Sequence, residues 1–379
     1  MRPAPYHADM RVLVTGGAGF IGSHLADRLL AAGHHVRAFD SLDPQVHPNG
    51  PPDYLDSNVE LIVGDVRDEV ALGKAMDDID AVVHLAAVVG VGQSMYEIRR
   101  YMDVNTVGCA VMLEQLVARR ERIQRLVVAS SMSIYGEGQY HNAQTGEGGL
   151  APGLRPESQL AERRWELETS TGDALLPERT AETKPLLPTS VYAVSKRDHE
   201  ELCLSIGAAY NVPTLALRLF NVYGPRQALS NPYTGVAAIF ASRLLNGHAP
   251  VAFEDGLQTR DFVHVTDVAR AFHLATESAA TGAALNVCTG EASSIFDVAQ
   301  GLAQGLNLAI EPELVGRYRA GDIRHCIGDP TRASELLDFR AEVEVKAGLG
   351  ELATWLADQE ADDHVDQAMD ELRQRGLER

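Results

Sequence analysis

The chain has 379 residues, enough for one large or two modest domains, and its hydrophobic fraction of 45% is ordinary for a globular protein with a substantial core. Its formal net charge of -20 argues against a nucleic-acid binder, because no basic stripe offsets the acidic balance. An anionic ligand therefore depends on local cations rather than on the overall field.

Secreted and membrane-bound classes are also disfavoured. The first ten residues carry charge and prolines without an apolar stretch, unlike a secretory signal. The longest apolar run, residues 81–91, is too short to span a bilayer. The four cysteines share no metal-knuckle or redox spacing, so we expect buried free thiols at Cys109, Cys203, Cys288 and Cys326. The sequence thus favours a soluble cytoplasmic protein with neither a membrane nor a nucleic-acid partner.

Strands and helices alternate through the first third of the chain. Short apolar runs predict strands at residues 11–15, 35–40, 59–65, 81–87 and 125–131. Helical patterns cover residues 20–32, which end at Gly33, and residues 104–120. Such alternation predicts an α/β fold in which a parallel sheet carries helices on both faces.

This pattern fails between Glu137 and Leu187. The segment is rich in Gly, Pro, Glu, Gln and Thr and has no sustained periodicity, so we expect an insertion or long loop there. Regular patterning resumes with a helix from about Val191 to Tyr210 and a strand at residues 214–219.

The rest of the chain is mixed, with strands near Val251 and Leu285 and an amphipathic helical tail from Leu349 onward. The pattern as a whole predicts a doubly wound Rossmann domain over residues 10–220. A smaller α/β substrate domain is expected mainly over residues 221–379, partly interwoven with the first.

A glycine-rich turn links the first strand to the first helix. Gly16, Gly19 and Gly22 stand at the spacing that permits a tight turn, close approach of a pyrophosphate and close helix packing. The pyrophosphate would sit on the helix N-terminus. Asp40 ends the next strand, where a carboxylate accepts from both ribose hydroxyls and repels a 2′-phosphate, and its neighbour Ser41 offers no cation. These residues predict NAD rather than NADP.

The run TGGAGFIGSHL, residues 15–25, resembles the opening of the extended short-chain dehydrogenase/reductases, the group of sugar-nucleotide epimerases and dehydratases. The likeness continues in GDV at residues 64–66 and HLAA at residues 84–87. It implies an extended Rossmann fold with Asp65 at the adenine amine. It further implies cofactor contacts at Phe20, Ile21, Val66, Leu85, Ala86, Ala87 and Asn105.

Tyr192 and Lys196 stand four residues apart in VYAVSK and so share one face of the predicted helix. A tyrosine with its ordinary pKa near ~10 is a poor base at neutral pH, but a lysine ammonium and a cationic nicotinamide ring lower that pKa. Tyr192 can then take a proton from a sugar hydroxyl while the carbon beneath gives its hydride to NAD. By the family likeness, Ser131 is the residue whose hydroxyl bonds the reacting oxygen.

The two positions after Ser131 bear on the type of reaction. In family members that look like 4,6-dehydratases, an Asp–Glu pair at these positions supplies the acid and base that remove water. This chain has Met132 and Ser133 there, and neither transfers a proton at neutral pH. The sequence therefore disfavours dehydration, and the likeness places both residues at the substrate.

The second half carries the residues that the likeness assigns to the nucleotide sugar. The segment FNVYGPR places Asn221 at the diphosphate or sugar and contributes Arg226. Arg260 matches an arginine that grips a phosphate, while Arg319 and Asp322 match a phosphate clamp and a nucleotide-ribose contact. Bidentate arginines suit a diphosphate in an acidic protein.

The likeness spans residues 11 to about 330 and is closest to the dTDP-L-rhamnose 4-epimerase and UDP-glucose 4-epimerase types. The first of these commonly carries cysteine pairs in its insertion, whereas this chain has none there, so we expect no metal. We predict an NAD-dependent 4-epimerase of dTDP- or UDP-hexoses or 6-deoxyhexoses that works through a transient 4-keto sugar. A ketoreductase, a 4,6-dehydratase and a non-catalytic NAD-binding scaffold remain alternatives. The likeness also implies a homodimer formed through the helices near Asn105 and Tyr192.

Overall fold

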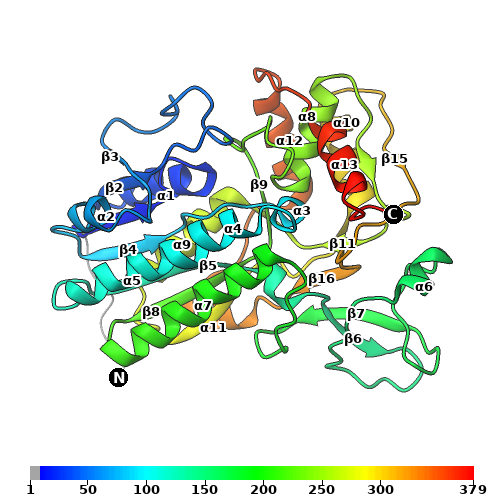
Figure 1. The fold of residues 1–379 in the computed structure, drawn as a ribbon, viewed down its shortest axis with the longest axis horizontal. Helices are drawn as coiled ribbons and strands as arrows, with labels where there is room; N and C mark the ends of the chain where they lie inside the picture. The colour runs from blue at the N-terminus through cyan, green and yellow to red at the C-terminus, as the bar shows by residue number, and fades with distance from the viewer. Residues whose placement is uncertain (1–8) are drawn as a thin grey trace.

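The computed structural model describes residues 9–379, so the expectation for the first ten residues lies almost entirely outside it (Figure 1). A seven-stranded parallel sheet with the order β13-β8-β5-β4-β1-β2-β3 forms its centre. Its strands are β1 (Arg11–Thr15), β2 (His35–Asp40), β3 (Glu60–Val63), β4 (Ala81–His84), β5 (Arg125–Ser131), β8 (Thr214–Leu219) and β13 (Ala283–Val287). The predicted doubly wound parallel sheet is confirmed.

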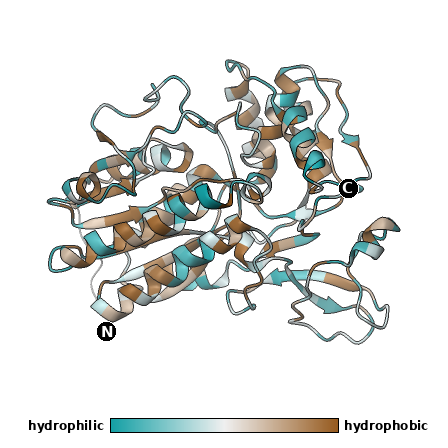
Figure 2. Ribbon diagram, viewed as in Figure 1, coloured by the Kyte–Doolittle hydropathy of each residue, from teal (hydrophilic) through white to brown (hydrophobic). Residues whose placement is uncertain are grey.

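Helices cover both faces of this sheet because its strands are apolar on both sides. Val12 and Val14 belong to one core cluster and Leu13 to the other, as the alternation of side chains along a strand requires. One face carries α1 (Phe20–Ala31), α9 (Val265–Glu277) and α11 (Thr331–Leu337), and the other carries α2 (Glu69–Ala75), α5 (Gly108–Ala118) and α7 (Val191–Tyr210). Figure 2 shows the strands of this sheet mostly brown between helices of mixed colour.

A third hydrophobic cluster lies beside the carboxyl ends of the strands. It is formed mainly by α8 (Val236–Leu245), α10 (Ile295–Gly305) and α12 (Val345–Leu356), and α13 (Val365–Gln374) is linked to α8 by the pair of Arg243 with Asp366. Two small parallel sheets accompany these helices, one of β9 (Asn221–Tyr223) and β12 (Phe262–His264) and one of β10 (Val251–Ala252) and β15 (Glu313–Leu314). Residues beyond 220 also supply α9 and β13 to the Rossmann layer, so the chain crosses between the two parts more than once.

The segment 137–187, for which we expect an insertion or long loop, contains regular structure, so the long-loop alternative is wrong. It contains β6 (Gln139–Asn142), α6 (Glu157–Ala161) and β7 (Leu175–Thr180), which project together at the lower right of Figure 1. These strands extend a five-stranded sheet with the order β14-β11-β16-β7-β6, completed by β11 (Thr259–Arg260), β14 (Ser293–Ser294) and β16 (His325–Gly328). β7 pairs antiparallel with β6 on one side and parallel with β16 on the other, and β16 lies too far along the chain for local periodicity to indicate that second pairing.

Two further helical segments differ from expectation. The predicted helix over residues 104–120 consists of a π-helical turn at Met102–Val107 followed by α5, and two short helices, α3 (Val91–Ser94) and α4 (Ile98–Tyr101), precede it. The predicted helical tail from Leu349 onward consists of two helices, α12 and α13, separated by residues 357–364. No helix within residues 9–379 combines the length and apolar character that crossing a membrane requires.

Candidate active site

A cavity of about 860 Å³ opens at the carboxyl ends of the parallel strands, between the Rossmann layer and the second part. Every residue that the sequence assigned to the cofactor, the chemistry or the substrate lines this cavity, except Asn105 and Arg226. The cavity lies at the topological switch point of the α/β sheet, where residues up to about three hundred positions apart in the sequence meet.

The glycine turn after β1 has the geometry of an anion site. A Cβ on Gly16, where φ is +70°, would lie 2.9 Å from the nitrogen of Ala86, and a Cβ on Gly22 would lie 2.2 Å from the oxygen of Gly16. The N-cap Gly19 makes no side-chain capping bond, and the first turn of α1 holds no acidic residue. The N–H groups at this helix N-terminus are therefore available to a pyrophosphate.

Asp40 is held at the end of β2, beside the glycine turn. Its carboxylate accepts from the backbone N–H of Ala18 at 3.0 Å and of Leu42 at 2.9 Å. Asp65, at the next strand end, accepts from the Arg67 guanidinium, and this hydrogen bond holds the pKa of Asp65 below its usual value. Both carboxylates line the cavity, and their placement fits the ribose and adenine end of NAD.

Asn105 does not line the cavity and instead braces it. It is buried within the π-helical turn, where its side-chain oxygen accepts from the N–H of Val88 at 2.8 Å. Its amide donates to the Val88 carbonyl at 3.1 Å and to Ser195 Oγ at 2.9 Å. These bonds hold the loop after β4 against α7, and a direct contact between Asn105 and the cofactor stays a prediction.

Ser131 and Tyr192 face each other across the cavity wall. Ser131 ends β5, and its Oγ accepts from the Ser133 N–H at 3.2 Å and the Ser133 hydroxyl at 2.9 Å. Tyr192 lies in the first turn of α7, which Ser190 caps by accepting from the N–H of Ala193. Burial raises the pKa of Tyr192 to about 12, and a hydrogen bond from Ser131 opposes this rise.

The predicted lowering of the Tyr192 pKa by Lys196 is wrong for the chain alone. Lys196 is buried, and its ammonium lies 3.2 Å from Nδ1 of His199 rather than on the phenol. Burial lowers the pKa of Lys196 to about 8. The sequence reasoning missed His199, although it lies three residues after Lys196 and therefore on the same helix face.

Met132 and Ser133 open the 3₁₀ turn that follows Ser131, and both line the cavity. Neither side chain has a carboxylate, so this edge of the cavity lacks the proton carriers that removal of water requires. The placement agrees with the argument from the sequence.

Arg226 is the residue whose predicted substrate role the structure does not support. It adopts a left-handed conformation with φ of +69° after the Gly224–Pro225 turn. Its guanidinium pairs with Asp27 at 2.8 Å and lies 5.2 Å from the ring centre of Tyr54. The turn thus directs the side chain to α1 and away from the cavity.

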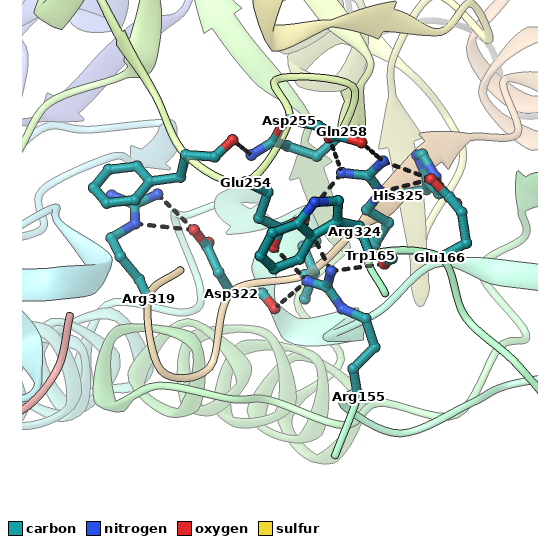
Figure 3. Close-up of polar contacts among 12 residues, drawn as sticks. Arg155, Trp165, Glu166, Glu254, Asp255, Gln258, Arg319, Asp322, Arg324 and His325 are labelled. Carbon is teal, nitrogen blue, oxygen red and sulfur yellow. Dashed lines mark hydrogen bonds and ion pairs between the residues drawn. The ribbon is translucent and has the colours of Figure 1, made fainter. Parts of the chain in front are cut away.

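The remaining substrate residues do meet at the cavity. Arg260 donates to the carbonyls of Ile323 and Arg324, which fixes its guanidinium against the segment before β16. The Arg319 guanidinium donates two hydrogen bonds to Asp322 Oδ2, at 2.9 and 2.7 Å. Figure 3 shows this pair beside Arg155 of the insertion. The side-chain oxygen of Asn221 is buried without a hydrogen-bond partner and is an available acceptor at this end.

An ionic cluster, buried at Arg155, Glu254 and Arg324, joins the insertion to this wall of the cavity. Arg155 forms a two-bond pair with Glu254, which also accepts from Arg324 at 2.9 Å (Figure 3). Glu166 in turn accepts from Arg324 and from Nε2 of His325. The sequence reasoning found no chemistry in residues 137–187, because charged residues in a loop are usually solvated and their partners lie far along the chain. That no metal binds in the insertion stays a prediction.

The chain matches the model of the "NAD dependent epimerase/dehydratase family" over residues 12–157 and 169–288. It is 37% identical over 353 residues to a dTDP-L-rhamnose 4-epimerase from Burkholderia thailandensis, covering 92% of this chain and 95% of that protein. It is 32% identical to a UDP-glucose 4-epimerase from Mycolicibacterium smegmatis, covering 90% and 96%.

Comparison with solved structures leads to the same family as the sequence comparison. The Thermus thermophilus UDP-glucose 4-epimerase in complex with NAD superposes with a TM-score of 0.73 at 31% identity, covering 92% of this chain and 99% of that chain. The predictions of fold class, of NAD as cofactor and of a nucleotide-sugar epimerase are confirmed by these matches. The chain belongs to the NAD-dependent epimerase/dehydratase family.

Proposed function

We propose that the chain is a 4-epimerase of a dTDP-6-deoxyhexose, which inverts the C4 hydroxyl through a transient 4-keto sugar without net oxidation. The observation that carries the proposal is the placement of Ser131 and Tyr192 at one cavity wall, with Met132 and Ser133 in place of proton carriers. The relative that is named a dTDP-L-rhamnose 4-epimerase supports this choice of nucleotide and sugar.

The residues at the cavity have different roles in the proposed epimerisation. Bound NAD supplies a reversible hydride acceptor next to the sugar carbon. Tyr192 takes the proton of the C4 hydroxyl and later returns it, and Ser131 Oγ holds the same oxygen by a hydrogen bond. We assign to Lys196, together with the positively charged ring of bound NAD, the role of favouring the phenolate against the burial that raises the pKa of Tyr192.

The cavity wall opposite supplies cations and polar groups for the rest of the substrate. Arg319 and Arg260 are the cations that we assign to the diphosphate, and Asp322 is the acceptor that we assign to the nucleotide ribose. Asn221, whose buried oxygen lacks a partner, is placed to accept from a sugar hydroxyl. Such local cations are needed in a chain whose net charge is -20.

The decisive experiment is incubation of the protein with NAD and a panel of dTDP- and UDP-hexoses and 6-deoxyhexoses, without a reductant. A product of unchanged mass with an inverted C4 proton coupling in the NMR spectrum supports the proposal. Loss of water would establish a dehydratase. Turnover only of 4-keto sugars, and only with added NADH, would establish a ketoreductase.

Two further properties belong to this proposal. We expect a homodimer formed across α4, the π-helical turn and α7, where Ile98, Val107 and Val194 are 53%, 48% and 40% exposed. Light scattering after size-exclusion chromatography should give twice the mass of one chain. We also expect the protein in the cytoplasm, where nucleotide sugars are made, and cell fractionation tests this.

A further inference from the structure

A set of buried side chains that the mechanism above does not use lies next to Lys196. His199 is fully buried on α7, and its Nδ1 lies 3.2 Å from Nζ of Lys196. Its Nε2 lies 2.8 Å from the main-chain oxygen of Asn105. One imidazole thus connects the lysine to the π-helical turn that also braces the loop after β4.

We propose that His199 is a positioning residue, which holds the Lys196 ammonium in place at the cavity by linking it to the Asn105 carbonyl. The proposal rests on the proposed function, because Lys196 matters only if Tyr192 transfers a proton. Only one arrangement of protons satisfies both contacts. The main-chain oxygen of Asn105 can only accept, so Nε2 carries the hydrogen and Nδ1 is free to accept from the ammonium.

The surroundings keep His199 neutral. Burial lowers its pKa well below the ordinary value, so the ring acts as an acceptor toward Lys196 across the working pH range. The titratable groups facing this pair are His84 from β4, Cys109 from α5 and Cys203 from α7. His84 is itself held by Thr15, at 2.8 Å from Nδ1, and makes no bond to the lysine in the described chain.

This arrangement has a direct consequence for the charge of Lys196. Burial disfavours the ammonium and, against the raising effect of Cys109 and Cys203, lowers its pKa to about 8. A hydrogen bond that the ammonium donates favours the charged form. Replacing His199 by an apolar residue leaves the ammonium without this acceptor, so the pKa of Lys196 must fall further.

The pKa of Lys196 can be measured without any substrate. Cyanate carbamylates only the neutral amine, and mass spectrometry of the peptide that contains Lys196 gives its rate at each pH. The exposed Lys346 serves as an internal control in the same sample. In His199→Leu we expect a pKa about one unit lower, so that Lys196 reacts about tenfold faster below its midpoint. The alkaline limb of kcat should move down by the same amount.

Two variants make the test specific. His199→Gln has an amide that can both accept from Lys196 and donate to the Asn105 carbonyl, so it should restore most of the wild-type pH profile. His34→Leu removes another buried histidine, one that bonds Glu277 far from the lysine, and should lower Tm while leaving Lys196 unchanged. If His199→Leu does not fold, His199→Met fills the same space with a flexible side chain.

An unchanged Lys196 pKa and an unchanged pH profile in the apolar variants would overturn the proposal and leave His199 a packing residue. A shifted Lys196 pKa in a protein that turns over no nucleotide sugar would support the positioning role while refuting the proposed function. The two failures are therefore distinguishable.

Discussion

Arg155 and Glu254 form an ion pair with two bonds, of 2.9 and 2.8 Å, between side chains that are only 2% and 3% exposed. Arg155 comes from the insertion, whereas Glu254 follows β10 on the wall of the substrate region. Nη2 of Arg155 also reaches the carbonyl of Asp322 at 3.4 Å. The insertion is thereby fastened to the short segment that carries Arg319 and Asp322, two residues of the cavity.

Replacing Arg155 by Leu should destabilise the protein and weaken substrate binding together. The change leaves a buried carboxylate with one cation fewer, so we expect the free energy of unfolding to fall by about 3 kcal/mol. KM for the nucleotide sugar should rise, whereas NAD affinity should not change. Arg164→Leu is the matched control, since Arg164 lies on the same insertion but pairs with Glu162 and Glu168 in solvent. Equal effects in denaturant unfolding would contradict the fastening role.

Glu166 should make stability depend on pH. His325 and then Arg324 lower the pKa of Glu166 to about 2, which is below its unfolded value. A lowered folded pKa means that the stabilisation is present above about pH 4.5 and is lost as pH falls toward 2. The side chain is 55% exposed, so solvent screening limits the effect to less than about 1 kcal/mol.

Glu166→Gln checks this sign. The stability difference between wild type and the variant in urea unfolding should be constant from pH 7 to 5 and should shrink at pH 4 and 3. A difference that widens as pH falls would show that the pairing has been misassigned.

The elements of the Rossmann half could be predicted from the sequence, whereas the ion pairs of the insertion could not. Strands such as β1 and β8 were predicted at their observed bounds, because buried parallel strands are apolar throughout. The same holds for α7, whose start and end carry local capping residues, Ser190 and Asn211. Short-range signals in the chain were sufficient for these elements.

Features that depend on distant partners were not accessible in this way. β7 pairs with β6 and also with the distant β16, and no local pattern indicates the second register. The family likeness placed Arg226 at the substrate, but a left-handed turn redirects its side chain to Asp27. The role of His199 depends on the fold of the Asn105 turn, which a helical pattern does not distinguish from an ordinary α-helix.

Tyr192→Phe should reduce kcat by about 10²- to 10⁴-fold, because the variant retains the ring but cannot carry a proton. NAD affinity and Tm should stay close to wild type, since the phenol makes few bonds that fold the chain. Tyr210→Phe, at the exposed end of the same helix, is the matched control. Proton NMR of the product gives the rates, and a fully active Tyr192→Phe would exclude Tyr192 as the base.

Asp40 should set the preference for NAD over NADP. In the double variant Asp40→Ser with Ser41→Arg, the carboxylate is lost and a cation is added where a 2′-phosphate would lie. We expect NAD affinity to fall about ten- to a hundredfold, since charge-assisted hydrogen bonds are lost, and NADP affinity to rise. Ser57→Arg adds the same charge on an exposed loop and should change neither. Calorimetric titration with both cofactors decides, and an unchanged preference would contradict the assignment of Asp40.

The C-terminal helix α13 should determine access of the sugar nucleotide. Leu372 lines the cavity and packs closely on Gly92, where an added Cβ would lie 3.4 Å from the Leu372 methyl groups. The neighbouring Glu371 carboxylate accepts hydrogen bonds from the Tyr96 and Tyr233 hydroxyls at 2.9 and 3.1 Å. Residues after the helix pair with the Arg319 segment, through the Ala320 N–H and the Leu377 carbonyl among others. An arginine at position 372 would therefore push a desolvated charge into an apolar wall.

Leu372→Arg should raise KM for the nucleotide sugar at least tenfold while NAD binding is retained, because the residues that we expect to bind NAD lie on the Rossmann half of the cavity. Gln374→Arg adds the same charge two residues away on the exposed face of α13 and should behave as wild type. Steady-state kinetics with calorimetric titration of NAD separates the two ligands. Equal loss of both in Leu372→Arg would mean that α13 supports the whole fold rather than the substrate side of the cavity.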